Sequence, residues 1–359
     1  HLQILLIDLQ NMAEGMFKAL LWGFAATVFA MAEAARGQRV PCYFVFGDSV
    51  FDNGNNNALN TSAKVNYSPY GIDFARGPTG RFSNGRNIPD FIAELLRFSD
   101  YIPPFTGASP DKAHTGINYA SGGGGIRKDT SQHLGDRISF KQQIYNHWTM
   151  ITTANVPPEK LNKCLYTINI GSNDYLNNYF MPAPYITNGK YTYDQYADSL
   201  ISGYRTYLKS LYALGARKVA VFGVSKLGCT PRMIASHGGG KGCAAEVNKA
   251  VEPFNKKLKA LVCDFNRNSD AKFTFVDLFS GQSPLAYAAL GFTVMDKSCC
   301  TVEAGEELCA ANKPVCAFRR RYVYWDNVHS TEAANMLVAK AAFAGVLTFP
   351  YSIALLAKL

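Results

Sequence analysis

The sequence lacks the features of disordered, repetitive and multidomain chains. Charged residues make up 18% of its 359 residues and hydrophobic residues 48%, a composition that is typical of a globular fold. It contains no linker rich in proline and serine and no internal repeat. We therefore expect residues 38–359 to form a single domain.

Long hydrophobic runs are also scarce. After the first 37 residues no run is long and apolar enough to cross a membrane, which takes about 20 residues. The uncharged run 19–32 is itself too short for a comfortable span, and it is followed by the alanine-rich residues 32–35, a pattern that signal peptidase cleaves. We predict that residues 1–37 comprise upstream residues and a signal peptide, in preference to an anchor helix, and that the protein is secreted. In a secreted protein Asn60 and Asn66, which each begin an Asn-x-Ser triplet, are acceptors for glycans.

The formal net charge of +9 is not concentrated in one patch. Apart from Arg319, Arg320 and Arg321, the basic residues are scattered along the chain, whereas a nucleic-acid-binding protein would gather them on one face. We therefore expect no nucleic-acid partner. The positive charge favours attraction to an acidic extracellular matrix.

Zinc-binding patterns are absent, although the chain has nine cysteines. No Cys-x-x-Cys pair with a nearby histidine pair occurs, so we expect no metal site. In an exported protein, clustered cysteines usually form disulfides that hold loops. Cys229 and Cys243 bracket a glycine-rich loop, and four more cysteines fall within 299–316, but the connectivity stays open. Because the total is odd, one thiol is unpaired or pairs with another chain, and we expect Cys164 to be a buried free thiol.

Strand and helix patterns alternate along the chain. Short apolar runs that end in a turn predict buried strands, and apolar residues at helical spacing predict helices between them. The predicted strands are 43–46, 165–170, 218–222 and 273–276, and the predicted helices are 87–98, 193–214, 245–265 and 331–343. This order favours an α/β fold with helices on both faces of a mainly parallel sheet. In such folds the site lies beyond the carboxyl ends of the strands.

Ser49 is the first candidate for a catalytic residue, because Gly47-Asp48-Ser49 follows the first predicted strand. A serine at a strand end can project its hydroxyl into a cleft, but a serine alone is more often a surface or capping residue. The hydroxyl becomes a useful nucleophile beside a base, and the base needs a carboxylate on its other nitrogen. Asp326 and His329 supply such a pair near the far end of the chain, although alone they could simply decorate the start of a helix.

Two segments offer donors for an oxyanion hole. Gly171-Ser172-Asn173-Asp174 follows a strand, and Asn173 has an amide donor. The run Gly122–Gly125 has backbone N–H groups that no side chain shields. Each donor to a developing negative charge contributes roughly 3–4 kcal/mol to catalysis, although a glycine run is more often just a flexible turn.

Two other assignments are disfavoured. The Gly-x-Ser-x-Gly elbow of α/β-hydrolases does not occur in the chain. His114, His133 and His147 have no carboxylate at a useful spacing, so we expect them to be structural or solvated.

Four blocks of sequence follow one another along the chain. They are Phe46-Gly47-Asp48-Ser49, Asn118-Tyr119-Ala120-Ser121-Gly122-Gly123, Gly171-Ser172-Asn173-Asp174 and Asp326-x-x-His329. In this order they resemble the plant GDSL esterase/lipases of the SGNH hydrolase superfamily. The resemblance covers nearly the whole mature chain and includes motifs within 52–56, 80–86 and 228–231. Val50 stands where the family name has leucine, which exchanges one apolar side chain for another.

The resemblance implies a three-layer α/β/α sandwich with a mainly parallel sheet, of the SGNH or flavodoxin-like type, and hydrolysis of acyl esters without a metal or cofactor. It implies that Ser49 is the nucleophile and that His329, oriented by Asp326, is the general base and acid. It also implies an oxyanion hole formed by the backbone N–H groups of Ser49 and Gly123 and by the side chain of Asn173. Gly122, one position away, is the alternative to Gly123.

The expected protein is a monomeric esterase or lipase of the plant apoplast or cell wall that hydrolyses an acyl or acetyl ester of a lipid, a wall polymer or a small metabolite. Acyl transfer by the same triad is one alternative. Partner binding by a non-catalytic secreted protein is another, which the intact catalytic set disfavours. We expect segments 51–86 and 279–316 to line the substrate pocket. The lack of a long apolar lid segment favours short to medium acyl chains.

Overall fold

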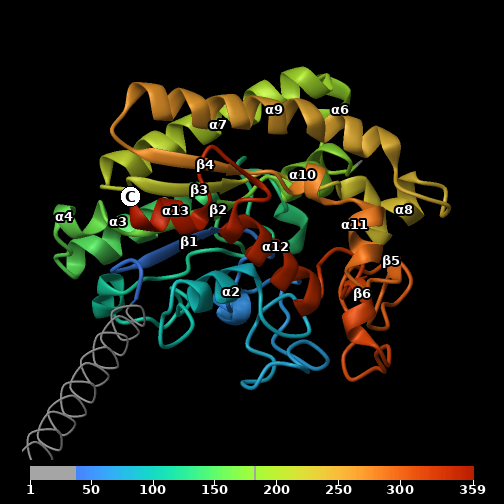
Figure 1. Ribbon diagram of the computed structural model, residues 1–359. Coiled ribbons are helices and arrows are strands. Elements are labelled where there is room, and N and C mark those ends of the chain that lie inside the picture. The colour runs from blue at the N-terminus through green and yellow to red at the C-terminus, as the bar shows by residue number, and fades with distance from the viewer. Residues whose placement is uncertain (1–37, 182) are drawn as a thin grey trace, which may run out of the picture. The chain divides into compact units, whose positions relative to one another are not determined.

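Four parallel strands form the centre of the unit Val40–Leu359, and a fifth, antiparallel strand extends the sheet at one edge (Figure 1). The computed structural model describes residues 38–181 and 183–359. The strands are β1 Tyr43–Gly47, β2 Leu165–Asn169, β3 Lys218–Phe222, β4 Lys272–Val276 and β7 Thr348–Phe349, in the order β1-β2-β3-β4-β7. The four predicted strands are thus confirmed as parallel neighbours. A separate two-stranded sheet consists of β5 Val294–Ser298 and β6 Tyr322–Tyr324.

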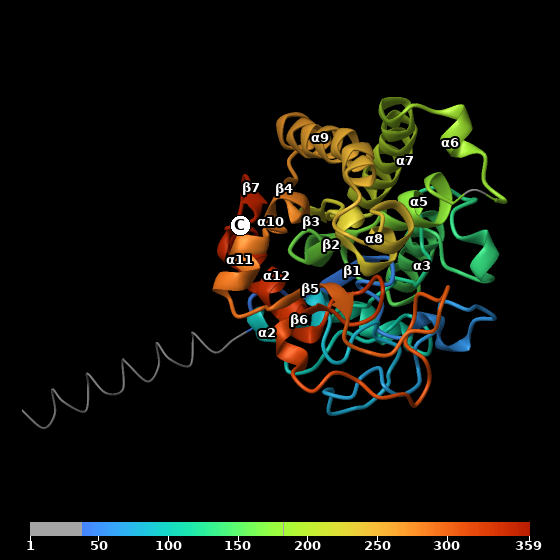
Figure 2. The same cartoon turned by 90° about the vertical axis from the view of Figure 1, so that its right-hand side faces the viewer.

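Helices cover both faces of this sheet (Figure 2). The α-helices are α2 Ile88–Leu95, α3 Phe140–Thr153, α4 Pro158–Leu161, α5 Ser172–Asp174, α6 Thr187–Lys190, α7 Tyr193–Ala213, α8 Pro231–His237, α9 Ala245–Asn268, α10 Leu278–Gly281, α11 Pro284–Ala289, α12 Glu332–Ala344 and α13 Ile353–Lys358. Shorter helical turns are Asn55–Ala58, Pro110–His114, Gln132–Leu134, Tyr175–Tyr179, Leu227–Cys229 and Arg319–Arg321.

Successive side chains of each strand point to opposite faces of the sheet, and both faces are apolar. On β1, Phe44 and Phe46 pack into the core beneath α3, α7 and α9. Tyr43 and Val45 pack into the second core, beneath α2, α12 and α13. The mainly parallel sheet between two layers of helices confirms the predicted α/β fold class.

Helix ends agree with the sequence where a strong capping residue is present. Thr331 caps α12, because its hydroxyl accepts a hydrogen bond of 3.3 Å from the N–H of Ala334. The helix predicted over 87–98 ends earlier, at Leu95, because Arg97 adopts a left-handed conformation with φ of 67°.

The extended segment 115–121 lies along the outer edge of β1. The N–H of Tyr43 donates to the carbonyl of Thr115 at 3.1 Å, and the N–H of Ser121 donates to the carbonyl of Gly47 at 3.1 Å. The segment runs parallel to β1. The glycine run 122–125 therefore emerges beside the carboxyl end of β1, next to Ser49.

All nine cysteines lie in the described residues. Eight of them form the disulfides Cys42–Cys164, Cys229–Cys243, Cys299–Cys316 and Cys300–Cys309. The prediction that Cys164 is a free thiol is wrong, because Cys42 and Cys164 precede the neighbouring strands β1 and β2. That register brings their Cα atoms to 4.7 Å, within the range of a disulfide. The unpaired cysteine is Cys263, which is half-buried on α9.

The predicted signal peptide, within residues 1–37, lies outside the described residues. Among the described residues, no helix combines the length and the hydrophobicity that a membrane crossing requires.

Candidate active site

Ser49 lies in the turn that leaves β1 at its carboxyl end. Two residues before Ser49 the chain requires a glycine, Gly47. A Cβ atom there would lie 2.5 Å from the carbonyl oxygen of Asn169 on β2, which is too close for any side chain. Asp48 fixes the turn, because its Oδ1 accepts a hydrogen bond of 3.1 Å from the N–H of Val50. Ser49 is 8% exposed, and it borders two cavities.

Ser49, His329 and Asp326 form a continuous hydrogen-bonded chain. Oγ of Ser49 lies 2.8 Å from Nε2 of His329. Nδ1 of His329 lies 2.8 Å from Oδ2 and 3.0 Å from Oδ1 of Asp326. The N–H groups of Val328 and His329 donate to Oδ1 of Asp326 at 2.8 and 2.6 Å, so one turn of chain holds both the imidazole and its carboxylate. A nucleophile, a base and an orienting acid need this arrangement.

The surroundings of His329 favour its protonated form. Burial by itself lowers the pKa of the imidazole, but the carboxylates around it, led by the charge and hydrogen bond of Asp326, together outweigh burial, and the pKa of His329 is raised. Asp48 and Glu307 act in the same direction. Burial raises the pKa of Asp48 itself to about 7. An imidazole that accepts a proton readily is a suitable base for a serine hydroxyl.

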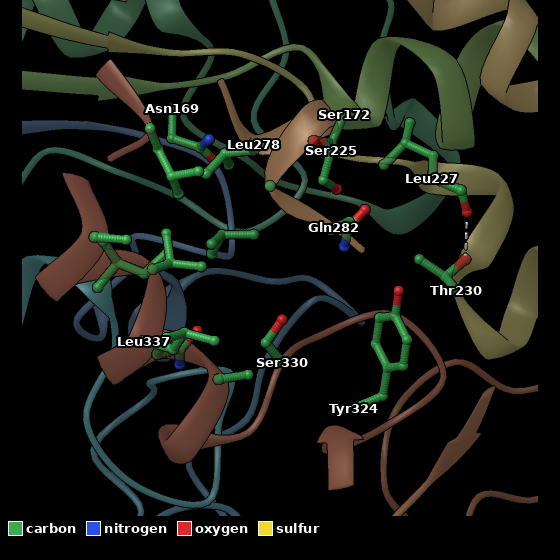
Figure 3. A pocket seen from close by; sticks show the side chains of 18 of the residues that line it. Asn169, Ser172, Ser225, Leu227, Thr230, Leu278, Gln282, Tyr324, Ser330 and Leu337 are labelled. Atoms are coloured by element: carbon green, nitrogen blue, oxygen red, sulfur yellow. Dashed lines mark hydrogen bonds between the residues drawn. The ribbon is translucent and has the colours of Figure 1, made fainter. Parts of the chain in front are cut away.

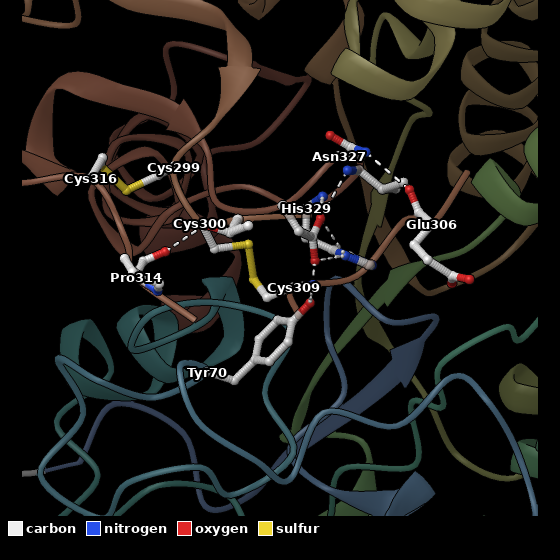
Figure 4. Close-up of a disulfide and its surroundings, with 12 residues drawn as sticks. Tyr70, Cys299, Cys300, Glu306, Cys309, Pro314, Cys316, Asn327 and His329 are labelled. Carbon is white, nitrogen blue, oxygen red and sulfur yellow. Dashed lines mark hydrogen bonds and ion pairs between the residues drawn. A yellow bond between two sulfur atoms is a disulfide. The ribbon is translucent and has the colours of Figure 1, made fainter. Parts of the chain in front are cut away.

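Tyr70 is a further partner of Asp326. Its hydroxyl donates a hydrogen bond of 2.7 Å to Oδ2 of Asp326 and accepts one of 3.0 Å from the N–H of Cys309. The disulfide to Cys300 holds Cys309 in place beside Tyr70 (Figure 4). Burial, reinforced by the charge of Asp326, raises the pKa of Tyr70 well above its ordinary value. The phenol therefore stays protonated and offsets part of the cost of burying the carboxylate.

Hydrogen bonding distinguishes the two candidate glycines. The N–H of Gly122 donates to Oδ2 of the buried Asp52 at 3.0 Å and is therefore engaged. The N–H of Gly123 has no hydrogen-bond partner among the described residues, and Gly123 borders a cavity together with Ser49 and Asn173. The N–H of Ser49 is also without a partner in that part of the chain. Two backbone donors are thus available beside the Ser49 hydroxyl.

Asn173 lies in α5, the helical turn after β2. Its Oδ1 accepts a hydrogen bond of 2.8 Å from Nδ2 of Asn177, and its Nδ2 donates one of 3.0 Å to the carbonyl of Gly124. The amide orientation is therefore fixed, and one of its two N–H groups is left for a ligand. The next residue, Asp174, holds the end of the glycine run, because its carboxylate accepts a hydrogen bond of 2.9 Å from the N–H of Ile126.

Two cavities meet at Ser49. The larger, about 340 Å³, lies between the carboxyl ends of the strands and helix α12, and we call it the α12 cavity (Figure 3). The smaller, about 250 Å³, is bordered by loop residues that include Phe82, Gly123, His133 and Glu306, and we call it the loop cavity. Segments 51–86 and 279–316, which we expect to line the substrate pocket, both contribute to these walls.

The structure brings the five predicted site residues together. Ser49, Gly123, Asn173 and His329 border the loop cavity, and Asp326 lies behind His329. Sequence reasoning missed Tyr70, which no motif marks. It also assigned His133 no place at the site, whereas His133 borders the loop cavity and its Nδ1 lies 3.0 Å from the hydroxyl of Tyr185.

Metal ligands do not gather at this site or elsewhere in the described ranges. Within 38–181 and 183–359, no three His, Cys, Asp or Glu side chains are arranged so that they could hold a metal ion.

The chain is similar to known proteins over nearly its whole length. The family model described as GDSL-like Lipase/Acylhydrolase matches residues 43–342. The chain is 81% identical to the Arabidopsis thaliana protein named GDSL esterase/lipase At2g19050, over 97% of this chain and 100% of that protein. It is 63% identical to GDSL esterase/lipase At2g19010 of the same plant, over 94% of this chain and 98% of that protein. It is 43% identical to GDSL esterase/lipase At1g29670, over 88% and 90%.

Proposed function

Since the chain belongs to the family of GDSL-like lipases and acylhydrolases, we propose that it hydrolyses acyl or acetyl esters with Ser49 as the nucleophile. His329 acts as general base and acid, and Asp326 orients it. The N–H groups of Ser49 and Gly123 and the amide of Asn173 form the oxyanion hole. The observation that carries this proposal is the 2.8 Å contact between Oγ of Ser49 and Nε2 of His329.

The first half-reaction forms an acyl-enzyme. Nε2 of His329 takes the hydroxyl proton as Oγ of Ser49 attacks the ester carbonyl. The resulting imidazolium is stabilised by Asp326 through Nδ1. The three donors stabilise the oxyanion of the tetrahedral intermediate. When this intermediate collapses, the bond to the alcohol breaks and His329 returns the proton to the leaving oxygen.

The second half-reaction releases the acid. A water molecule gives a proton to Nε2 of His329 and attacks the acyl carbon. The same donors stabilise the second tetrahedral intermediate. The bond to Oγ of Ser49 then breaks, and His329 reprotonates the serine.

A hydrolysis assay tests this proposal. We expect the wild-type protein to hydrolyse p-nitrophenyl butyrate to free butyric acid and Ser49→Ala to retain no rate above the uncatalysed reaction. Ser202→Ala is a matched control, because Ser202 is exposed on α7 and borders neither cavity at Ser49. Equal rates for the wild type and Ser49→Ala would overturn the proposal. Transfer of the butyryl group to an added alcohol in place of water would reassign the enzyme as an acyltransferase.

We further propose that residues 38–359 form the mature domain and that it is secreted to the apoplast or cell wall. Four disulfides support export, because they persist mainly in oxidising compartments. Asn60 and Asn66 are both exposed and thus accessible to a glycan. Plant cells that express the full chain should release a glycosylated protein to the medium. Retention of all of it inside the cell would contradict the proposal.

A further inference from the structure

The two cavities at Ser49 differ in which catalytic groups they contain. Ser49, Asn173, Leu176 and Val328 border both of them. His329 and Gly123 border only the loop cavity. An ester bound at Ser49 has two arms, the acyl chain and the alcohol, so each cavity has room for one arm.

The position of His329 determines which cavity holds the alcohol and which holds the acyl chain. This step rests on the proposed function. The proton on Nε2 must reach the oxygen of the departing alcohol. That oxygen must therefore lie on the side of Ser49 that His329 faces, which is the loop cavity. The acyl chain must then occupy the α12 cavity.

The lining of the α12 cavity suits a hydrocarbon chain. Ala334, Leu337, Val338 and Ala341 form one face of α12 at helical spacing, and Leu278 and Leu347 border the same cavity. The stretch from Ala334 to Ala341 spans about 10 Å at 1.5 Å per residue. Leu290 and Val346, which are 56% and 78% exposed, also border this cavity and bring it to the surface.

The loop cavity is more polar. Glu306 and Glu307 border it together with His133 and Asn177. Glu307 forms an ion pair of 2.5 Å with Arg232. These side chains offer hydrogen-bond donors and acceptors to a hydroxylated alcohol, beside apolar walls that include Leu134, Met181 and Leu308.

From these observations we propose that the α12 cavity binds the acyl chain and the loop cavity the alcohol. The substrate class is an ester of a medium-length fatty acid with a polar alcohol. Ala341 is a specificity-determining residue, because its side chain faces the part of the cavity two helical turns beyond Ala334.

Two ester series measured on the wild-type protein test the direction of binding. In p-nitrophenyl esters from acetate to octanoate, only the acyl chain grows, and we expect kcat/KM to rise at each step. In alkyl acetates from ethyl to octyl, only the alcohol grows, and we expect no rise. A rise with alcohol length and none with acyl length would reverse the assignment and overturn the proposal.

A cavity-filling variant tests the location. Ala341→Trp should lower the ratio of kcat/KM for the octanoate to kcat/KM for the acetate by about tenfold, which corresponds to the exclusion of two methylene groups. Ala344→Trp is the matched control, because Ala344 is exposed on the same helix and borders neither cavity. An octanoate-to-acetate ratio equal in Ala341→Trp and the wild type would contradict the assignment. If Ala341→Trp unfolds, as its melting temperature would reveal, the two wild-type series decide the question.

The outcomes separate this inference from the proposed function. If hydrolysis persists in Ser49→Ala, or no ester is cleaved, the proposed function fails. If hydrolysis depends on Ser49 but follows the length of the alcohol, only the assignment of the cavities fails.

Discussion

The hydroxyl of Tyr70 donates a hydrogen bond of 2.7 Å to Oδ2 of Asp326, across 256 residues of sequence. The same carboxylate oxygen lies 2.8 Å from Nδ1 of His329. Tyr70 and His329 therefore compete for the charge of one oxygen atom. Tyr70 is a positioning residue, since it acts on the base only through Asp326.

We expect Tyr70→Phe to move the acidic limb of the kcat/KM profile to higher pH. Without the phenolic donor, more of the carboxylate charge is available to His329, whose pKa is already raised by Asp326. His329 must be neutral to act as a base, so a higher pKa means loss of activity at a higher pH. The plateau should also fall by about tenfold, because without the phenol the carboxylate of Asp326 is held less firmly in the position that orients His329.

Tyr67→Phe is the control for this variant. Tyr67 packs against Tyr70, with ring centroids 5.4 Å apart, and its hydroxyl donates to the carbonyl of Cys309 at 2.9 Å, but it makes no hydrogen bond to Asp326. A merely structural role for Tyr70 predicts that both variants lower the melting temperature and leave the acidic limb in place. That outcome would show that Tyr70 is not a positioning residue for His329.

Asp326→Asn should lower kcat by roughly 10⁴-fold and leave the fold intact, by analogy with other triads. The amide cannot hold the imidazolium or select the tautomer in which Nε2 accepts the serine proton. Circular dichroism checks the fold, and steady-state kinetics check the rate. Asp296→Asn, at an exposed carboxylate of β5, should turn over normally. Near-normal turnover of Asp326→Asn would exclude Asp326 from the triad.

Asn173→Ala should lower kcat by about 10²- to 10³-fold with little change in KM, since the amide is proposed to bind the oxyanion of the transition state. Asn188→Ala is the matched control, because Asn188 is exposed on α6 and borders neither cavity at Ser49. An effect confined to KM would mean that Asn173 binds the substrate in its ground state and is no part of the oxyanion hole.

The proposed catalytic residues could be picked out from the sequence because each of them lies in a short local motif. The strand-end position of Ser49, the three-residue spacing of Asp326 and His329, and the turn that carries Asn173 are all visible in one stretch of sequence. The hydrogen bond between Tyr70 and Asp326 cannot be read from one stretch of sequence, because it depends on how the loops around Cys309 fold. The choice between Gly122 and Gly123 depends in the same way on the carboxylate of Asp52, which engages the N–H of Gly122.

The disulfide between Cys42 and Cys164 was also missed because it depends on the tertiary structure. An apolar neighbourhood suggested a buried thiol, but the pairing follows from the register of two strands that are 122 residues apart. The antiparallel strand β7 also escaped prediction, because two residues carry no periodic pattern.

Replacement of both Cys42 and Cys164 by serine should destabilise the domain by about 2–5 kcal/mol, because the disulfide closes a long loop in the unfolded chain. Thermal unfolding measures this loss. Cys263→Ser is the control, and it should abolish the single thiol that the unfolded wild-type protein presents to a thiol reagent. Three titratable thiols in the unfolded, unreduced wild type would show that Cys42 and Cys164 are not paired.

The central claim is that Ser49 is the nucleophile, and a p-nitrophenyl alkylphosphonate tests it most directly. This reagent forms a stable bond only with an activated hydroxyl. Mass spectrometry of the treated protein should find one adduct, on the peptide that contains Ser49, with release of one equivalent of p-nitrophenol and none from Ser49→Ala. An adduct on another residue, or equal labelling of Ser49→Ala, would contradict the account.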